Sequence, residues 1–157
     1  MNHLRQLEHR LGYHFVSRFY LYNALHYRAP NFNQLEWLGD TVLDVVLAYS
    51  LVRSGDYDPQ QLTLIRMAVN SHPTQARIGQ RLGLTDVLHT NNGHISANQL
   101  ENAFEALVGA VFLDTGGDFQ RTSRVILPHL RPYITAEVQK PQYANVRRQL
   151  GLSEPEG

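Results

Sequence analysis

The chain has 157 residues, of which 43% are hydrophobic and 18% are charged, which is enough for one domain with a sizeable core. Its 14 basic residues balance its 14 acidic ones, so there is no overall attraction for polyanions, and the lack of cysteine leaves thiol catalysis without an agent. The sequence contains neither a transmembrane run nor a signal-peptide pattern, so we expect no membrane association and a location in the cytoplasm or in the interior of an organelle.

Segments with a helical hydrophobic period follow one another along the chain, separated by short stretches rich in Gly, Pro or Asn. They predict helices at 3–11, 17–27, 33–53, 59–70, 72–82, 98–115 and 118–137. Strand-like alternation is scarce, so the pattern favours an all-α domain, which we place at residues 1–138. Residues 139–157 are expected to form a tail or linker.

The helix predicted at 33–53 carries two acidic residues, Glu36 and Asp40, inside an apolar run. A spacing of four puts both side chains on one face of a helix, where their oxygens can converge on one cation. No Lys or Arg lies within 41–52, so ion pairs inside the helix do not explain the acids. Apart from Asp44, the helix is apolar nearly all round, which predicts a place in the interior or at a subunit contact.

The helix predicted at 98–115 adds a second polar edge. Asn102 and Glu105 share this edge beside a broad apolar stripe. Gly109 continues the edge one turn further and leaves space for a neighbouring helix or a substrate backbone. This second segment strengthens the case for a site that holds a cation.

Taken in order, these motifs resemble the catalytic domain of ribonuclease III, the endonuclease that cuts double-stranded RNA. The resemblance rests on Leu11-Gly12-Tyr13, Ala24-Leu25, Leu35-Glu36-Trp37-Leu38-Gly39-Asp40 and Phe104-Glu105-Ala106-Leu107-Val108-Gly109-Ala110. It implies an all-α helical bundle that dimerises. It also implies hydrolysis of a phosphodiester with the help of Mg²⁺, for which Mn²⁺ could substitute, and no small-molecule cofactor.

The resemblance implies four catalytic positions that bind the metal, and they fall on Glu36, Asp40, Asn102 and Glu105. Asn102 stands where the family usually has Asp. An amide oxygen can ligate a hard cation but brings no charge, so the affinity for Mg²⁺ should be lower. Glu101 lies next to this position, but one helical step turns its side chain about a quarter-turn away, so we do not expect it to replace residue 102.

The implied partners are double-stranded RNA and a second copy of the chain. Phosphate contacts require cations, and the residues considered for them are Arg28, Arg66, Arg77, Arg81, Arg147 and Arg148, with His26 and His72 as further possibilities. A solvated helix face is the alternative for each arginine. Trp37 and Phe32 are the residues considered for the subunit contact, with a place in the core as the alternative for Trp37.

Two other functions remain open on the sequence. One is a catalytically impaired or inactive domain that binds or scaffolds RNA, for example in a ribosomal or RNA-processing assembly, and the other is a dimerisation module that does not touch RNA. Three retained carboxylates favour the enzyme. Longer members of the family carry a separate RNA-binding domain after the nuclease domain, and residues 139–157 are too few to form one, so we expect modest, salt-sensitive RNA affinity.

Overall fold

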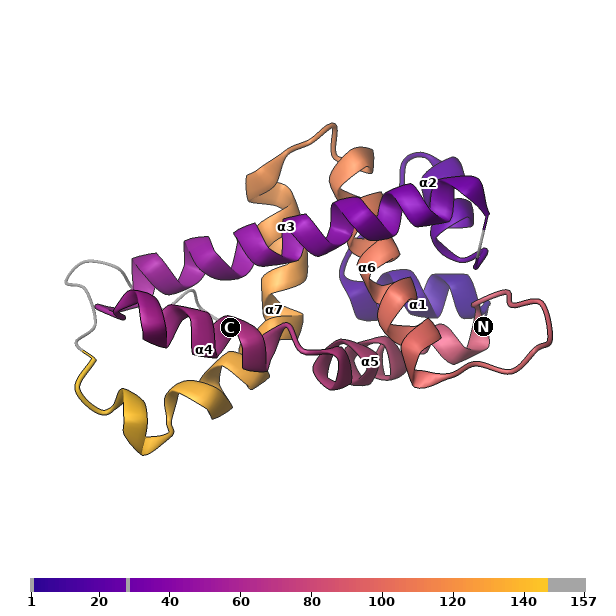
Figure 1. Ribbon diagram of the computed structural model, residues 1–157. Helices are drawn as coiled ribbons and strands as arrows, with labels where there is room; N and C mark the ends of the chain where they lie inside the picture. Colours follow the sequence, from indigo (N-terminus) through magenta and orange to yellow (C-terminus); the bar gives the residue numbers. More distant parts are fainter. Residues whose placement is uncertain (1, 28, 147–157) are drawn as a thin grey trace.

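The structure is a computed structural model that describes residues 2–27 and 29–146 (Figure 1). Its helices are α1 (His3–Leu11), α2 (Arg18–Ala24), α3 (Pro30–Ser54), α4 (Pro59–Val69), α5 (His72–Arg81), α6 (Ala97–Asp114) and α7 (Phe119–Val138), with short 3₁₀ helices η1 (Leu84–Asp86) and η2 (Pro141–Tyr143). Within the described ranges, extended pairing is limited to one isolated bridge, between His26 and His89. The prediction of an all-α fold is therefore confirmed.

Each predicted helix is present, and the largest differences in bounds flank the turn between α2 and α3. α2 ends at Ala24 because the chain then pairs with a distant segment: the N–H of His89 donates to the carbonyl of Leu25, and the N–H of Tyr27 donates to the carbonyl of His89. α3 begins earlier than predicted because Pro30 occupies its first turn, where a proline is favourable.

α3 and α6 form the centre of the molecule, and α3 crosses α6 near its amino-terminal half (Figure 1). The two backbones approach very closely at two glycines. A methyl group built on Gly39 would lie 1.7 Å from the carbonyl oxygen of Glu105, and one on Gly109 would lie 2.2 Å from that of Leu35. Gly109 therefore makes room for a neighbouring helix, as the sequence predicted.

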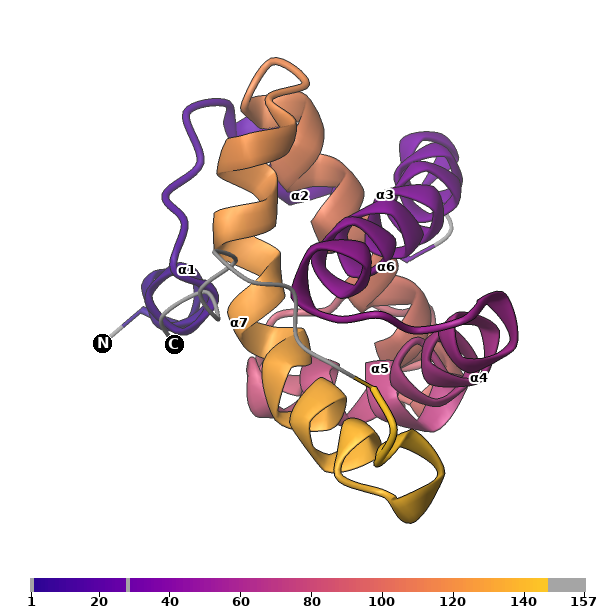
Figure 2. The same ribbon diagram turned by 90° about the vertical axis from the view of Figure 1, so that its left-hand side faces the viewer.

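The remaining helices enclose this pair. α5 and α2 pack against α6, while α7 packs against α3, α4 and α6, and Figure 2 shows α7 between α1 and α4. The end of α6 is tied to the amino-terminal segment through Asp114. Its carboxylate accepts a hydrogen bond from the Tyr13 hydroxyl at 2.6 Å and from the N–H groups of Val16 and Ser17 at 2.8 Å each.

α3 is buried on one side only, which corrects part of the sequence analysis. Trp37 is 76% exposed, so its alternative place in the core is wrong, and Val45 and Val52 are also exposed. Phe32 is 1% exposed and belongs to the core, so it cannot be a subunit contact on this surface. The apolar residues of α3 thus divide between a core face and an unpartnered outer face.

The segment after α7 remains close to the body of the protein as far as residue 146. Tyr143 in η2 is buried and its ring meets that of Tyr57 edge to face, with the ring centroids 6.3 Å apart. The rest of the predicted tail, 147–157, lies outside the described residues, so the boundary at 138 stays a prediction. None of the described helices combines the length and apolarity needed to span a membrane.

Candidate active site

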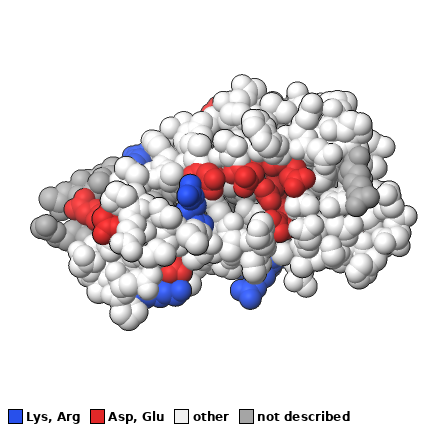
Figure 3. All heavy atoms as spheres, viewed as in Figure 1, with Lys and Arg blue, Asp and Glu red and all other residues white. Residues whose placement is uncertain are grey.

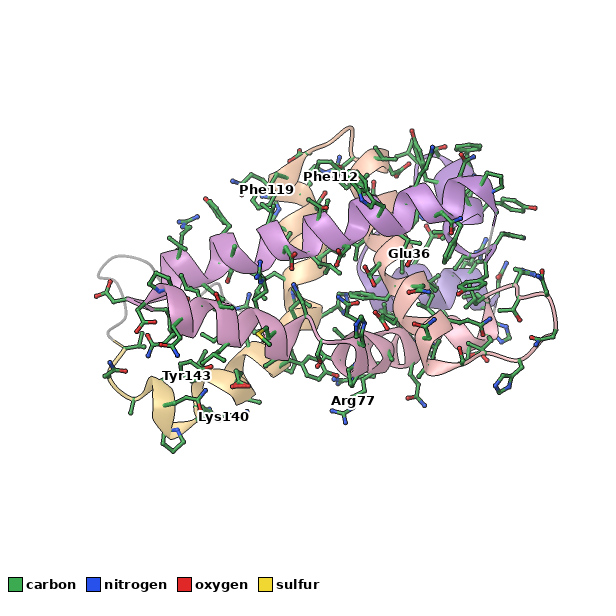
Figure 4. The ribbon with its side chains drawn as sticks, viewed as in Figure 1. Glu36, Arg77, Phe112, Phe119, Lys140 and Tyr143 are labelled. Carbon is green, nitrogen blue, oxygen red and sulfur yellow. The ribbon has the colours of Figure 1, made fainter. Side chains whose placement is uncertain are left out.

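The first half of the site comes from α3. Glu36 and Asp40 lie one turn apart on the same side of the helix, with Glu36 partly buried and Asp40 exposed. Figure 4 shows Glu36 where α3 crosses α6. Gly39 brings the backbone of α6 into contact immediately beside these residues, and the charges of both carboxyl groups act on Glu105 of that helix.

The second half comes from α6, whose start is fixed by a capping box. The Ser96 side chain accepts a hydrogen bond from the N–H of Gln99 at 3.1 Å, and the Gln99 side chain accepts one from the N–H of Ser96 at 2.9 Å. This anchored first turn leads directly into Glu101 and Glu105, which are only 5% and 7% exposed. Two glutamates are thus held inside the protein near the helix crossing.

The carboxyl groups from the two helices act strongly on one another. Burial first, and then the charges of Asp40, Glu101 and Glu36, raise the pKa of Glu105 to about 8, and Glu105 also shares a hydrogen bond with Asp40. The pKa of Glu36 is raised as well, by burial and by Glu101 and Asp40. Acidic side chains form a row across the middle of the face that Figure 3 shows, and this row is called the acidic row below.

Glu101 acts on this cluster, although the sequence analysis did not expect it to replace Asn102. Its charge contributes to the raised pKa of both Glu36 and Glu105. The physical reason is that Glu101 precedes Glu105 by four residues and shares its helical face. That spacing was visible in the sequence and was the signal that could have identified it.

Glu101 also has a partner on another helix. Its Oε1 contacts Nδ1 of His72, which lies at the start of α5. The helix begins there because the Ser71 side chain accepts a hydrogen bond from the N–H of Thr74. His72 had been considered for RNA contact, and the structure instead turns it toward a buried carboxylate.

Asn102 occupies a different position from the four acids. It is partly buried, and its Nδ2 donates to the hydroxyl of Tyr27 at 3.3 Å. Tyr27 belongs to the segment between α2 and α3, so the Asn102 side chain links α6 to that segment. Of the four predicted site residues, Glu36, Asp40 and Glu105 therefore act on one another, while the amide of Asn102 is engaged with Tyr27.

The donor chemistry of this cluster suits a hard divalent cation, since it offers several carboxylate oxygens in a partly buried place. The cage is not preassembled, because across 2–27 and 29–146 no three Asp, Glu, His or Cys side chains are already arranged as ligands of one ion. The carboxyl groups would therefore have to rotate to hold a cation together.

Exposed basic side chains lie on the helices next to α3 and α6. Arg66 on α4 and Arg77 and Arg81 on α5 are exposed. Figure 3 shows one basic patch next to the acidic row and another at the lower edge of the same face, separated from the row by uncharged residues. Figure 4 shows Arg77 projecting from α5 on the side away from α3. Three of the predicted contact residues, Arg28, Arg147 and Arg148, lie outside the described residues.

His26 belongs to a stack of rings rather than to the acidic row. Its imidazole lies 3.7 Å from the ring of Tyr22 and 4.4 Å from that of His89, measured between ring centroids. Its Nδ1 is 2.6 Å from the carbonyl oxygen of Tyr22. His26 therefore has a structural role in the junction between α2 and the loop that precedes α6.

An apolar groove of about 610 Å³ lies beside the amino-terminal half of α3. It is lined by Phe19, Tyr20, Asn23, Asn31, Asn33, Gln34, Leu35, Trp37, Leu38 and Leu113. The side chains of Phe19, Trp37 and Leu113 are exposed although they are large and apolar. A contiguous apolar surface of this kind is typical of a protein interface.

Comparisons with known proteins agree with this geometry. The Ribonuclease III domain family matches residues 33–116, which include both halves of the acidic cluster. Ribonuclease 3 of Campylobacter fetus is 33% identical over 127 residues, which cover 74% of this chain and 57% of that protein. Ribonuclease 3 of Sulfurovum sp. is 30% identical over 162 residues, which cover 96% of this chain and 73% of that protein. The chain thus spans only part of the length of these relatives.

Solved structures of ribonuclease III nuclease domains also superpose on this fold. The crystal structure of the nuclease domain of ribonuclease III from Campylobacter jejuni superposes with a TM-score of 0.72 at 28% identity, covering 84% of this chain and 96% of that domain. A second structure of that domain, at 27% identity and the same TM-score of 0.72, concerns structural flexibility in a region involved in dimer formation. The matched motifs, the helical architecture and the acidic cluster together show that this chain belongs to the ribonuclease III family.

Proposed function

We propose that this protein is a metal-dependent endonuclease that cleaves double-stranded or structured RNA by phosphodiester hydrolysis, as in RNA processing. The observation that carries the proposal is the meeting of Glu36 and Asp40 from α3 with Glu105 from α6 at a glycine-lined helix crossing. Separate segments of a family nuclease motif thereby form one acidic site. Action in the cytoplasm or in an organelle interior is part of the proposal.

The carboxylates would bind Mg²⁺, with Mn²⁺ as a substitute. A divalent cation held there supplies Lewis-acid stabilisation of charge on phosphate oxygens and lowers the pKa of a bound water. The protein's own residues act by binding, because Glu36 and Asp40 offer carboxylate oxygens beside Glu105, whose pKa is raised and which adds a negative charge when its proton leaves. Release of the proton that Glu105 retains at neutral pH would accompany binding of the cation.

RNA would approach along the acidic row, with exposed arginines at its sides contacting phosphates. Arg66 is the described residue proposed for this contact, because it is exposed on α4, which packs against α3. Arg77 is also exposed, but it projects from α5 on the side away from α3. The chain has no net charge, so we expect weak binding that falls steeply with salt concentration.

A second copy of the chain is the proposed occupant of the apolar groove beside α3. The same surface carries both the groove and the protruding side chains of Phe19, Trp37 and Leu113, so it can be self-complementary about a twofold axis. Dimer formation by the Campylobacter jejuni nuclease domain supports this choice of partner. Pairing in this way would place two acidic rows in one assembly.

A labelled RNA duplex, incubated with the protein and Mg²⁺ or Mn²⁺, tests the proposed activity. We expect cleavage by the parent protein and its loss in Glu105→Gln, which keeps the shape of the side chain and removes its charge. Equal cleavage by the parent and Glu105→Gln would contradict the proposed site. Addition of EDTA should abolish cleavage by the parent protein.

One observation favours a non-catalytic RNA-binding or scaffolding role as the second candidate. Asn102 brings no charge to the site, and its amide is engaged with Tyr27. The same assay separates the two functions when Asn102→Asp is included. If Asn102→Asp cleaves RNA and the parent protein does not, the site of the parent is impaired at residue 102. If neither protein cleaves RNA but both bind it, the protein is a scaffold.

A further inference from the structure

Glu101 is the least exposed of the four acids at the helix crossing. We propose that in this chain Glu101, rather than Asn102, completes the metal-binding set with Glu36, Asp40 and Glu105, and that His72 holds Glu101 in position for that role. The inference rests on the proposed metal-dependent function and assigns two residues to it.

The spacing of the acids along α3 and α6 supports this assignment. Glu101 and Glu105 are four residues apart on α6, as Glu36 and Asp40 are on α3, so each helix presents two carboxyl groups on one face. The two pairs meet at the close contact between the helix backbones, next to Gly39. Four carboxyl groups from two helices thus lie close enough for the charges of Asp40, Glu101 and Glu36 to act on Glu105.

The contacts of Asn102 also favour Glu101 as the ligand. Asn102 is one residue further along α6, and its amide nitrogen is engaged with the Tyr27 hydroxyl. The amide of Asn102 offers one neutral oxygen, whereas the side chain of Glu101 is a carboxylate and is only 5% exposed. Mg²⁺ prefers charged oxygen ligands, so Glu101 is the better donor in its chemistry.

The burial of Glu101 favours it as a ligand as well. An ionised carboxylate removed from water is costly unless it is paired or coordinates a metal. In the described part of the chain, the ion-pairing partner of Glu101 is His72, whose own side chain is 86% exposed, rather than a Lys or Arg. Other buried glutamates are paired differently: Glu137, for example, accepts from Lys140 at 2.8 Å. A cation at the site would give Glu101 a permanently charged partner, whereas His72 is charged only when it is protonated.

His72 fits a positioning role because of the atom that it touches. Its Nδ1 contacts Oε1 of Glu101, so Oε2 is the oxygen that we propose for the cation. Contacts of this kind from outside the ligand set fix the direction of a ligating carboxylate. His72 would therefore act on the metal through Glu101 and would not itself bind it.

The test is direct measurement of Mn²⁺ binding to the full chain, by calorimetry and by electron paramagnetic resonance of free Mn²⁺, without RNA. Glu101→Gln should weaken binding by at least about tenfold, and Asn102→Ala by less than about twofold. Glu137→Gln is the matched control, a buried glutamate elsewhere in the protein, and should bind Mn²⁺ as the parent does. Thermal unfolding in EDTA checks that each variant is folded.

The role of His72 is tested by comparing Mn²⁺ binding in two variants, one that removes its contact with Glu101 and one that can partly restore it. His72→Ala should weaken Mn²⁺ binding by about tenfold, and His72→Asn, whose amide can still donate toward Glu101, should recover part of that loss. In a Glu101→Gln background, His72→Ala should have no further effect on binding. An equal additional loss there would show that His72 acts independently of Glu101 and would overturn its positioning role.

The outcomes separate the inference from the proposed function. Tight Mn²⁺ binding by Glu101→Gln together with loss in Asn102→Ala would overturn the assignment and leave a metal-dependent nuclease intact. Absence of Mn²⁺ binding by the parent protein itself would overturn both. Loss of binding in Glu101→Gln, with binding kept in Asn102→Ala and Glu137→Gln, is the expected result.

Discussion

Gly39 of α3 lies directly against the backbone of Glu105 of α6, so closely that a methyl group on Gly39 would stand 1.7 Å from the Glu105 carbonyl oxygen. Gly109 makes the reciprocal contact with the carbonyl of Leu35. Both neighbours are backbone atoms that cannot rotate away. The acidic residues of the two helices therefore meet because the residues between them have no side chain.

Gly39→Ala should consequently destabilise the protein and separate the two halves of the site. We expect the free energy of unfolding to fall by about 3 kcal/mol, since relief of the clash requires movement of a whole helix. Urea unfolding followed by circular dichroism measures the loss. Gly93→Ala is the control: nothing lies within 4 Å of its added methyl group, and its φ of 72° should cost only about 1 kcal/mol. Equal losses in the two variants would contradict the packing role of Gly39.

Glu105 should make the stability of the metal-free protein depend on pH. Its pKa is raised from 4.5 to about 8, so between these values the folded chain holds a proton that the unfolded chain has released. The free energy of unfolding should therefore fall as the pH rises through this window. Urea midpoints at pH 5, 6, 7 and 8 in EDTA measure the slope.

Two comparisons assign that slope to Glu105. Glu105→Gln stays uncharged and should flatten the dependence, whereas Glu137→Gln, which removes a buried glutamate paired with Lys140, should retain it. Mn²⁺ in place of EDTA should also flatten it, because a bound cation takes over the role of the proton. A slope that persists in Glu105→Gln would assign the effect to other groups.

Much of this architecture could be read from the sequence. The period of apolar residues predicted each α-helix of the described chain but neither of the short 3₁₀ helices η1 and η2, because most of the α-helices bury one stripe against the α3 and α6 pair. The spacing of Glu36 and Asp40, with Gly109 after Glu105, predicted both halves of the acidic cluster. These features depend on local periodicity, which a single sequence contains.

The features that the sequence did not predict depend on contacts between segments that are distant in the chain. The end of α2 is set by pairing with His89, and the partner of Glu101 is His72 on another helix. The position of Glu101 was judged by its angle from Asn102, whereas the face that matters is the one shared with Glu105. Which face of α6 is turned to α3 is decided by the glycine contact, and this is a tertiary property.

Asp114 should contribute stability with the opposite dependence on pH. Burial alone would raise its pKa, but hydrogen bonds from Tyr13, Ser17 and Val16 outweigh burial, so the net pKa lies below its ordinary 3.8. This contribution is present at neutral pH and is lost as the pH falls through the folded pKa. Asp114→Asn should lower the free energy of unfolding at pH 7 by about 2 kcal/mol, and Tyr13→Phe by about 1 kcal/mol.

Urea unfolding of the parent and Asp114→Asn at pH 7 and at pH 3 tests this assignment. The difference between the two proteins should shrink at the lower pH, where the carboxylate of the parent becomes protonated and resembles the amide. A difference that stays constant or grows in acid would mean that Asp114 does not act through its charge.

Trp37 offers a direct test of the proposed dimer, because it is the one tryptophan of the chain and lies 76% exposed beside the apolar groove. If a second copy covers this surface, the fluorescence emission of Trp37 should shift to shorter wavelength as the protein concentration rises, and the sedimentation coefficient should increase over the same range. Trp37→Glu should hold the protein as a monomer, because a charge would be buried at the contact. Met67→Glu, on an exposed apolar residue of α4 outside the groove, should dimerise as the parent does. Dimerisation by Trp37→Glu at the parent's concentrations would place the subunit contact on another face.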